Sequence, residues 1–293
     1  MTGKLSNLNY RVGIDYTREM DKLWMDSSFS VGIPTSFVVD RDGHIAFIGS
    51  PTQLEEVLPK ILTGSWRISD EAKAADAERI AKGERTMPIF AKLTPALKGQ
   101  DWAKALSVVE EAVAVLPDDV NFRVLQADLL LHRLRDLQAG LPVMRQLVRD
   151  ATNKKSALWM AEAMRQLFDP ANDNSHLPQA ERFAMGNELS EHILAINPPQ
   201  PGEAPKFVSY PTVAQYYYES GNKDRAIELI EVTLKSLDGA AHIPDNLKQQ
   251  VVSELVQTLA NYKGQKACYG SVCATPQPGV SQSTKAQAPE ERR

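Results

Sequence analysis

The segment from Gly32 to Gly49, GIPTSFVVDRDGHIAFIG, constrains the fold more than any other part of the sequence. It contains two β-rich runs, Ser36–Val39 and Ile45–Ile48, separated by a turn that includes Asp42-Gly43. Glycine accepts the positive φ that a tight hairpin turn needs. The segment therefore predicts an antiparallel β-hairpin.

Shorter patterns flank this hairpin. Arg11–Asp15 is expected to be extended, and Met20–Ser27 has apolar residues at helical spacing. After the hairpin, Leu54–Leu62 is also amphipathic, and Gly64 closes it. Pro59 lies inside this pattern and predicts a helix that is kinked or starts late, because proline removes a backbone donor.

The β signal fades beyond Trp66, and helical patterns follow. Asp70–Glu84 is rich in alanine and charge, as is typical of a surface helix or a helical linker. The patterns then come in pairs: Ile89–Lys98 with Trp102–Val115, Val120–Arg133 with Gln138–Asp150, Ala157–Leu167 with Gln179–Ala195, Pro211–Tyr218 with Asp224–Leu237, and finally Asp245–Tyr262. The fold class predicted is α+β, with an all-α region after the hairpin.

Composition excludes several classes of protein. The 293 residues are 43% apolar and 24% charged, as in a globular chain. The net charge of −4 provides no basic field for nucleic acid. No window approaches the roughly 18 apolar residues of a transmembrane helix, and the first residues contain no apolar segment of a secretory signal. We expect no nucleic-acid partner and no transmembrane segment.

Two helix pairs share a junction of a glycine, a polar pair and a small alanine. The residues are Gly99 and Ala105 in one pair, and Gly221 and Ala226 in the other. This junction resembles the tetratricopeptide repeat (TPR), which implies a helical-repeat region that binds a protein partner. The units lie 122 residues apart, which is not a multiple of the roughly 34-residue period of that family. A degenerate array and a helical bundle without a repeat register both remain open.

The hairpin segment, with Ile33-Pro34 before it and a helix after it, resembles the second half of a thioredoxin-like domain. It is most similar to the redoxin branch that includes the TlpA-type thiol–disulfide oxidoreductases. The resemblance implies a cis peptide bond before Pro34 and outward-facing backbone groups of Ile33, which would pair with an extended partner peptide. Ile33 and Pro34 are thus the candidate substrate-contact residues. An unrelated hairpin with a turn proline is the alternative.

The chemistry of that family belongs to a Cys-x-x-Cys at a helix N-terminus, where the thiolate is stabilised. No cysteine precedes Cys268 in this sequence. We expect either that the chain starts after the first half of such a domain, which we favour, or that the helical region covers the open strand. The resemblance alone leaves open whether the protein is an enzyme; the chain itself is expected to lack reductase activity, with no catalytic residue.

The two cysteines, Cys268 and Cys273, are separated by four residues and follow the last predicted helix. A short-loop disulfide, two inert thiols and a reactive pair all remain open. They are too few for a structural zinc site. The histidines have no ligand spacing, so we expect no metal and no cofactor: His44, His132, His176, His192 and His242.

The predicted organisation is a partial thioredoxin-like domain (1–66), a helical linker (67–87), a TPR-like helical domain (88–264) and a disordered tail (265–293). The predicted function is that of a thioredoxin-like thiol–disulfide oxidoreductase family member without its Cys-x-x-Cys half, which binds a protein partner through the helices and the groove at Pro34. A non-catalytic TPR-like scaffold is the alternative. The resemblance implies the bacterial cell envelope, although no signal is visible in this chain.

Overall fold

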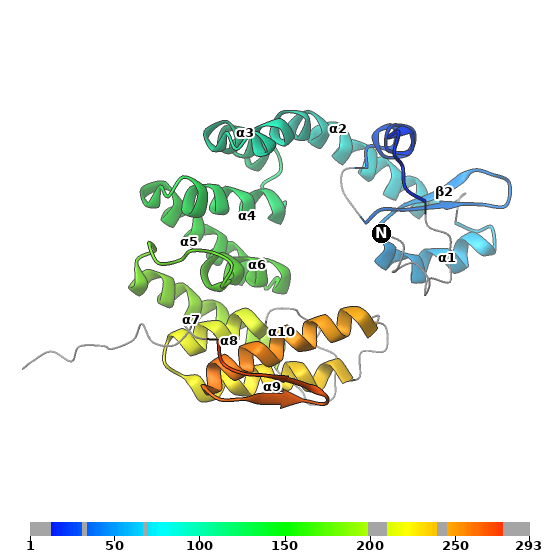
Figure 1. Cartoon of the computed structure of the whole chain (residues 1–293). Coiled ribbons are helices and arrows are strands. Elements are labelled where there is room, and N and C mark those ends of the chain that lie inside the picture. Colours follow the sequence, from blue (N-terminus) through cyan, green and yellow to red (C-terminus); the bar gives the residue numbers. More distant parts are fainter. Residues whose placement is uncertain (1–12, 31–33, 67–68, 199–209, 239–244, 278–293) are drawn as a thin grey trace, which may run out of the picture. The chain divides into compact units, whose positions relative to one another are not determined.

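A computed structural model describes residues 13–30, 34–66, 69–198, 210–238 and 245–277 (Figure 1). The chain divides into two compact units, residues 1–115 and 116–293. The described residues are mostly helical, and each unit contains one small two-stranded sheet. This composition agrees with the predicted α+β class.

The first unit contains the predicted hairpin, confirmed as an antiparallel pair of strands. Its elements are η1 (Asp21–Met25), η2 (Asp26–Ser28), β1 (Ser36–Val39), β2 (Ile45–Gly49), η3 (Pro51–Gln53), α1 (Leu54–Leu62), α2 (Asp70–Lys98) and α3 (Trp102–Val115). Phe37 lies opposite Ile48, and Val38 lies opposite Phe47. The next pair joins Val39 to Ile45, so Ala46 is the extra residue of a β-bulge. Gly43 supplies the positive φ of the turn, at 82°.

A small core joins this hairpin to the helices beside it. Phe47, Val57 and Trp66 are buried together, and four partly buried residues pack around them: Val38, Leu54, Ile61 and Ala72. The core takes residues from β2, α1 and the start of α2, so it holds the hairpin between the two helices.

Several predictions for this unit differ from the structure. Met20–Ser27 is helical as predicted, although most of it is a π-helical turn followed by a 3₁₀ turn. Of Arg11–Asp15, only residues 13–15 are described, and they form no strand. Helix α1 begins at Leu54 and continues through Pro59. This is tolerated because proline removes only one backbone donor from a short helix.

The predicted division around residue 87 also differs. Residues 70–98 form the single helix α2, which covers most of the expected linker and continues into the expected helical domain. Helix α2 packs along α3, and the first compact unit ends at Val115. Because α2 and α3 pack together, the first compact unit extends to Val115, beyond the predicted boundary at residue 87.

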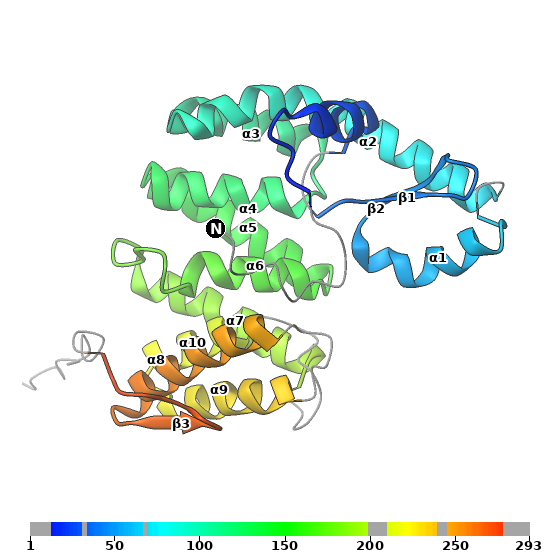
Figure 2. The same cartoon turned by 45° about the vertical axis from the view of Figure 1, so that its right-hand side comes forward.

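The second unit is a succession of packed helices. Its elements are α4 (Val120–Asp128), η4 (Leu129–Arg133), α5 (Leu137–Asn153), α6 (Ala157–Phe168), α7 (Gln179–Ile196), α8 (Tyr210–Glu219), α9 (Lys223–Asp238), α10 (Asp245–Lys263), β3 (Ala267–Tyr269) and β4 (Val272–Ala274). Figure 2 shows the successive helices of this unit one after another, and consecutive helices contact each other. From Trp102 onward the predicted helices are confirmed, with ends that differ by at most three residues.

Small residues lie where these helices approach closely. Ala226 at the α8–α9 junction is fully buried, and Gly221 before it has a φ of 92°. A Cβ on Gly186 of α7 would lie 2.5 Å from the ring of Phe168. At Gly186 the aromatic rings of the neighbouring helices come close because this residue has no side chain, whereas Gly221 is needed for its positive φ.

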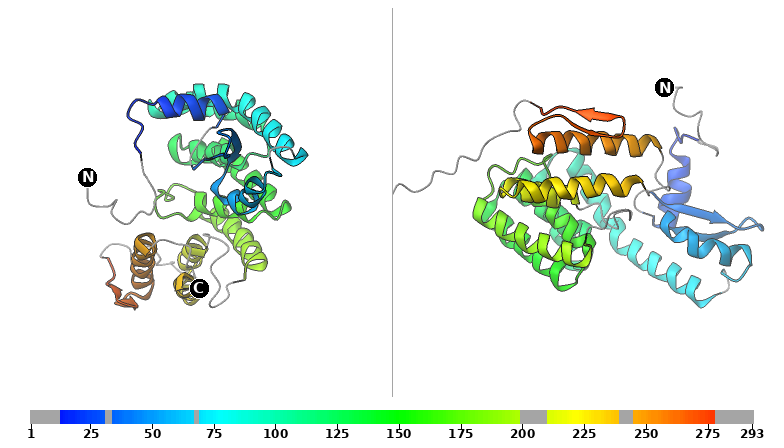
Figure 3. Two further views of the ribbon diagram at one scale, coloured as in Figure 1. Left: turned by 90° about the vertical axis from the view of Figure 1, so that its right-hand side faces the viewer. Right: turned by 90° about the horizontal axis from the view of Figure 1, so that it is seen from below.

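The prediction of a disordered tail from residue 265 is wrong for its first part. Residues 267–274 form the hairpin β3–β4, which packs on α10 (Figure 3, right). Ala267 is buried in the core, and Tyr269 and Val272 pack against it. Residues 278–293 lie outside the described residues. None of the helices in the described ranges has the length and hydrophobicity to cross a membrane.

Candidate functional site

Of the two predicted substrate-contact residues, the structure describes Pro34, which comes two residues before β1. Ile33 is outside the described residues, and so is the peptide bond that joins it to Pro34. Pro34 is exposed and lines a pocket of about 660 Å³. The other walls come from the η2 segment, the end of β2 and the middle of α2. This pocket is the candidate functional site.

The end of β2 is held in place by a capping box. The backbone N–H of Ser50 donates to Gln53 Oε1 at 3.0 Å, and the N–H of Thr52 donates to Ser50 Oγ at 3.3 Å. Gly49 precedes this motif, and a Cβ there would lie 2.5 Å from the ring of Phe47. The glycine and the capping box together position the pocket wall opposite Pro34.

Helix α2 supplies the charged wall of the pocket, through Glu78, Arg79 and Lys82. The Arg79 guanidinium donates to the carbonyl oxygen of Ser28 and to the carboxylate of Asp76, so it ties α2 to the η2 segment. Helix α2 thus brings one acidic and two basic side chains to the pocket. None of the residues lining the pocket in the described ranges is a cysteine or a histidine.

The close approach of α2 to the η2 segment depends on Gly83. A Cβ at this position would lie 2.2 Å from the Cβ of Phe29. Phe29 lines the same pocket. Replacement of Gly83 would therefore move a pocket wall.

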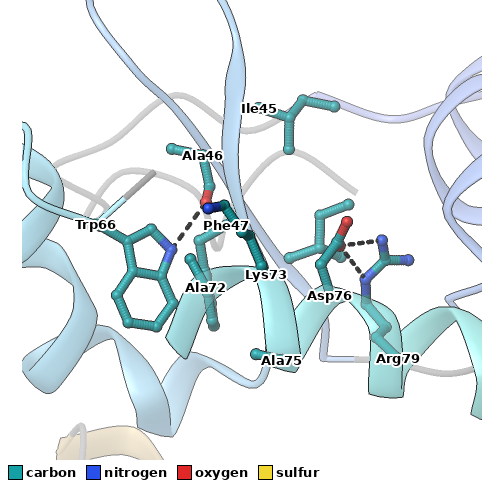
Figure 4. Close-up of a pocket in the computed structure, with 10 residues that line it drawn as sticks. Ile45, Ala46, Phe47, Trp66, Ala72, Lys73, Ala75, Asp76 and Arg79 are labelled. Atoms are coloured by element: carbon teal, nitrogen blue, oxygen red, sulfur yellow. Dashed lines mark hydrogen bonds and ion pairs between the residues drawn. The ribbon is translucent and has the colours of Figure 1, made fainter. Parts of the chain in front are cut away.

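The outer edge of β2 is covered, as Figure 4 shows. The Trp66 indole N–H donates to the carbonyl oxygen of Ala46, the bulge residue, at 3.0 Å. The neighbouring pocket between β2 and α2 holds about 300 Å³. Because Trp66 takes the free carbonyl of the bulge, this edge is a poor template for a further strand.

The outer edge of β1 is not paired by any strand of the described residues. The N–H of Asp40 donates to the carbonyl of His44 at 2.8 Å, so Asp40 faces β2. Alternate residues of a strand direct their backbone groups to opposite sides, so those of Phe37 and Val39 point away from β2. This unpaired edge begins two residues after Pro34.

The turn of the hairpin holds a small acidic cluster. Asp40 Oδ1 accepts hydrogen bonds from the N–H groups of Asp42 and His44, at 3.0 and 2.9 Å. The ligand atoms of these three residues lie within 4.8 Å of one another. The Asp40 carboxylate is used by the turn itself, so the cluster has a structural explanation and does not change the expectation that no metal is bound.

The two cysteines lie in the second unit. Cys268 and Cys273 are directly opposite each other in the β3–β4 hairpin and form a disulfide. The sequence leaves open a disulfide, two inert thiols and a reactive pair. The structure contains the disulfide. The pair follows the C-terminus of α10 in the sequence and does not open a helix.

Sequence reasoning missed the residues that build the pocket and cover the edge. The S-x-x-Q pattern from Ser50 to Gln53 is a recognised capping signal and could have been found. Nothing in the local sequence links Trp66 to Ala46 or Arg79 to Ser28, because these contacts join segments 20 and 51 residues apart.

Comparison with known proteins gives one partial match. No protein-family model matches the sequence, and no solved structure matches it. Protein FixW of Rhizobium leguminosarum is 36% identical over 125 residues, which are 42% of this chain and 57% of FixW. The chain is similar to part of FixW. The match spans less than two thirds of that protein, whose name specifies no reaction.

Proposed function

We propose that the chain is a thioredoxin-like, redoxin-type protein that binds an extended segment of a partner protein at Pro34 and along β1. The observation that carries this proposal is the pocket of about 660 Å³ at Pro34, from which the unpaired edge of β1 continues. The order of elements, a proline followed by an antiparallel hairpin and a helix, supports the assignment to this family.

Strand addition is the physical basis of the proposed binding. The outward N–H and C=O groups of Phe37 and Val39 can pair with a partner backbone, while pockets select the partner's side chains. The charged side chains of α2 at the pocket favour a polar partner residue beside Pro34. Since this chain has no cysteine before Cys268, we propose that this site binds its partner without reducing it.

A peptide-binding experiment tests the proposal. The probe is a fluorescently labelled extended peptide of alternating valine and lysine, and binding is followed by anisotropy. Val39→Pro removes the outward N–H but no bond to β2, so it should abolish binding. Val39→Ala keeps the N–H and should retain binding. Equal binding by both variants contradicts strand addition.

A second measurement addresses the chemistry. The purified chain should show no disulfide-reductase turnover at the Pro34 site with a dithiol regenerating system. Turnover that persists after Cys268→Ser with Cys273→Ser would contradict the proposed non-reducing site.

The second candidate is a non-catalytic helical scaffold of the TPR type. It is favoured by Ala105 and Ala226, which are fully buried at the α2–α3 and α8–α9 contacts, as the shared junction requires. In that case a partner protein would bind equally well to the Val39→Pro and Pro34→Ala variants, because the helical surfaces would carry the binding.

A further inference from the structure

The β3–β4 hairpin carries its disulfide on the solvent side. Its residues alternate in burial, since successive side chains of a strand point to opposite faces. One face packs on the helical core with four residues: Ala267, Tyr269, Val272 and Ala274. Cys268 and Cys273 belong to the other face and are exposed. Neither cysteine takes part in the packing of the hairpin on α10.

Contacts without sulfur hold the hairpin in place. Gln257 Nε2 donates to the carbonyl oxygen of Thr275 at 2.8 Å, and the N–H of Gln277 donates to Asn261 Oδ1 at 3.0 Å. The Tyr269 hydroxyl donates to the Asp238 carboxylate at the end of α9. These bonds involve α9, α10 and both sides of the hairpin, so cleavage of the disulfide leaves them intact.

The disulfide also closes a very short ring. The cysteines are 5 positions apart, and closing so short a loop removes little entropy from the unfolded chain. The turn between them is already formed by Gly270, which has a φ of 56°. The dithiol and disulfide forms can thus share one backbone conformation.

We propose that Cys268 and Cys273 form a reversible thiol–disulfide exchange site, whose partner is a protein dithiol of the Cys-x-x-Cys class. Disulfides that are exposed, and whose sulfur atoms do not pack against the core, exchange readily. This inference is independent of the Pro34 site.

The exchange balances in two steps. A thiolate of the partner attacks one sulfur of the pair, a mixed disulfide forms, and the Cys268–Cys273 bond breaks; the released thiolate takes a proton from water. The second partner thiol gives its proton to water and attacks the partner's own sulfur in the mixed disulfide. The second cysteine of this chain then leaves as a thiolate and is protonated. Two electrons have passed to this chain, and the partner holds a new disulfide. A dithiol completes both steps within one encounter, whereas a monothiol needs a second molecule.

The test compares reduction of the native and the denatured full-length chain. Oxidised protein is mixed with a reduced thioredoxin-class protein, or with glutathione, quenched with acid and alkylated, and the added mass is measured. A small dithiol should reduce the native and the denatured chain at rates within about tenfold of each other, since access is not limiting. Glutathione should react more slowly than the protein dithiol.

Two further measurements sharpen the assignment. The oxidised native chain, mixed with a reduced partner that lacks its second cysteine, should form a mixed disulfide as the Cys268–Cys273 bond breaks, and peptide mapping of the trapped adduct identifies the attacked sulfur. Tyr269→Phe removes the bond to Asp238 while it keeps both sulfurs. It should make the pair several-fold easier to reduce at equilibrium, because the two thiols are held opposite each other less firmly.

Either of two results would overturn the proposal. One is a native pair that resists the protein dithiol until denaturant is added. The other is a loss of the helical circular dichroism signal on reduction, which would make the disulfide a structural staple. Faster reduction by glutathione than by the protein dithiol would contradict the assigned partner class.

Discussion

The indole N–H of Trp66 donates a 3.0 Å hydrogen bond to the carbonyl oxygen of Ala46, which the β-bulge leaves outside the ladder of the hairpin. Trp66 is only 5% exposed, and its ring meets Phe47 edge-on with centroids 6.3 Å apart. One side chain thus satisfies a strand carbonyl, covers one sheet edge and joins the hairpin to the core. In the described part of the chain, no strand pairs with the other edge, on β1.

Replacing Trp66 tests this relationship. Trp66→Phe keeps an aromatic ring but leaves the Ala46 carbonyl without its donor, which should cost about 1–3 kcal/mol. Amide hydrogen exchange in β2 should speed up accordingly. Lys60 lies over the same ring, with Nζ 5.3 Å from the centroid. Lys60→Met keeps the hydrogen bond and is the control, so equal effects of the two changes would contradict the role assigned to the bond.

The approach of α2 to the pocket wall can be tested by a double-mutant cycle. Gly83→Ala should destabilise the first unit by about 1–3 kcal/mol, because the new Cβ overlaps Phe29 and its relief moves backbone. Phe29→Gly removes the overlapping Cβ together with the ring, and the double variant should lose less than the sum of the two single changes. Urea unfolding measures the three variants. Strict additivity would show that Gly83 and Phe29 do not limit each other.

The buried alanine of the first helix pair gives another prediction. Ala105 is fully buried on α3, whereas Ala103 on the same helix is exposed. Ala105→Leu should overfill the α2–α3 contact and cost about 1–3 kcal/mol. Ala103→Leu should change the unfolding free energy by less than about 0.5 kcal/mol. Thermal unfolding of the two variants makes the comparison, and similar losses would argue against close packing at Ala105.

His132 in the second unit should make the stability of that unit depend on pH. His132 Nε2 lies 3.0 Å from the carbonyl oxygen of Gln166, and His176 Nε2 lies 2.7 Å from that of Leu131. A carbonyl only accepts, so each Nε2 carries a hydrogen. Their ring centroids are 6.1 Å apart. A proton added to His132 therefore places a charge beside the His176 ring.

Burial lowers the pKa of His132, and the charges of His176 and Arg133 lower it further, while Asp128 and the Gln166 carbonyl oppose the shift. A folded-state pKa below the unfolded one means that the unfolded chain takes up the proton first. Stability is complete above about pH 6.5 and falls as the pH drops below that value. Urea unfolding across this range should show the fall. The loss of stability at low pH should be smaller in His132→Gln. It should be unchanged in His192→Gln, because His192 is exposed.

Prediction from sequence succeeded where the signal is local. The Asp42-Gly43 turn and the β-rich runs beside it form the hairpin, since the turn needs only a residue that tolerates positive φ. The helices from Trp102 onward follow their apolar periodicity. The β3–β4 hairpin was missed because its three-residue strands alternate too briefly to be recognised, and they are stable only on α10.

The sequence by itself determined where the main hairpin turns, where most helices begin and end, and that the chain before Cys268 has no thiol. Only the tertiary structure decided that Trp66 covers the edge of β2, that no described strand pairs with the outer edge of β1 after Pro34, and that Cys268 and Cys273 share an exposed face. The physical reason is the separation along the sequence of the residues that interact. A turn or a helix depends on neighbouring residues, whereas an edge, a pocket or an exposed sulfur depends on what distant segments of the chain cover.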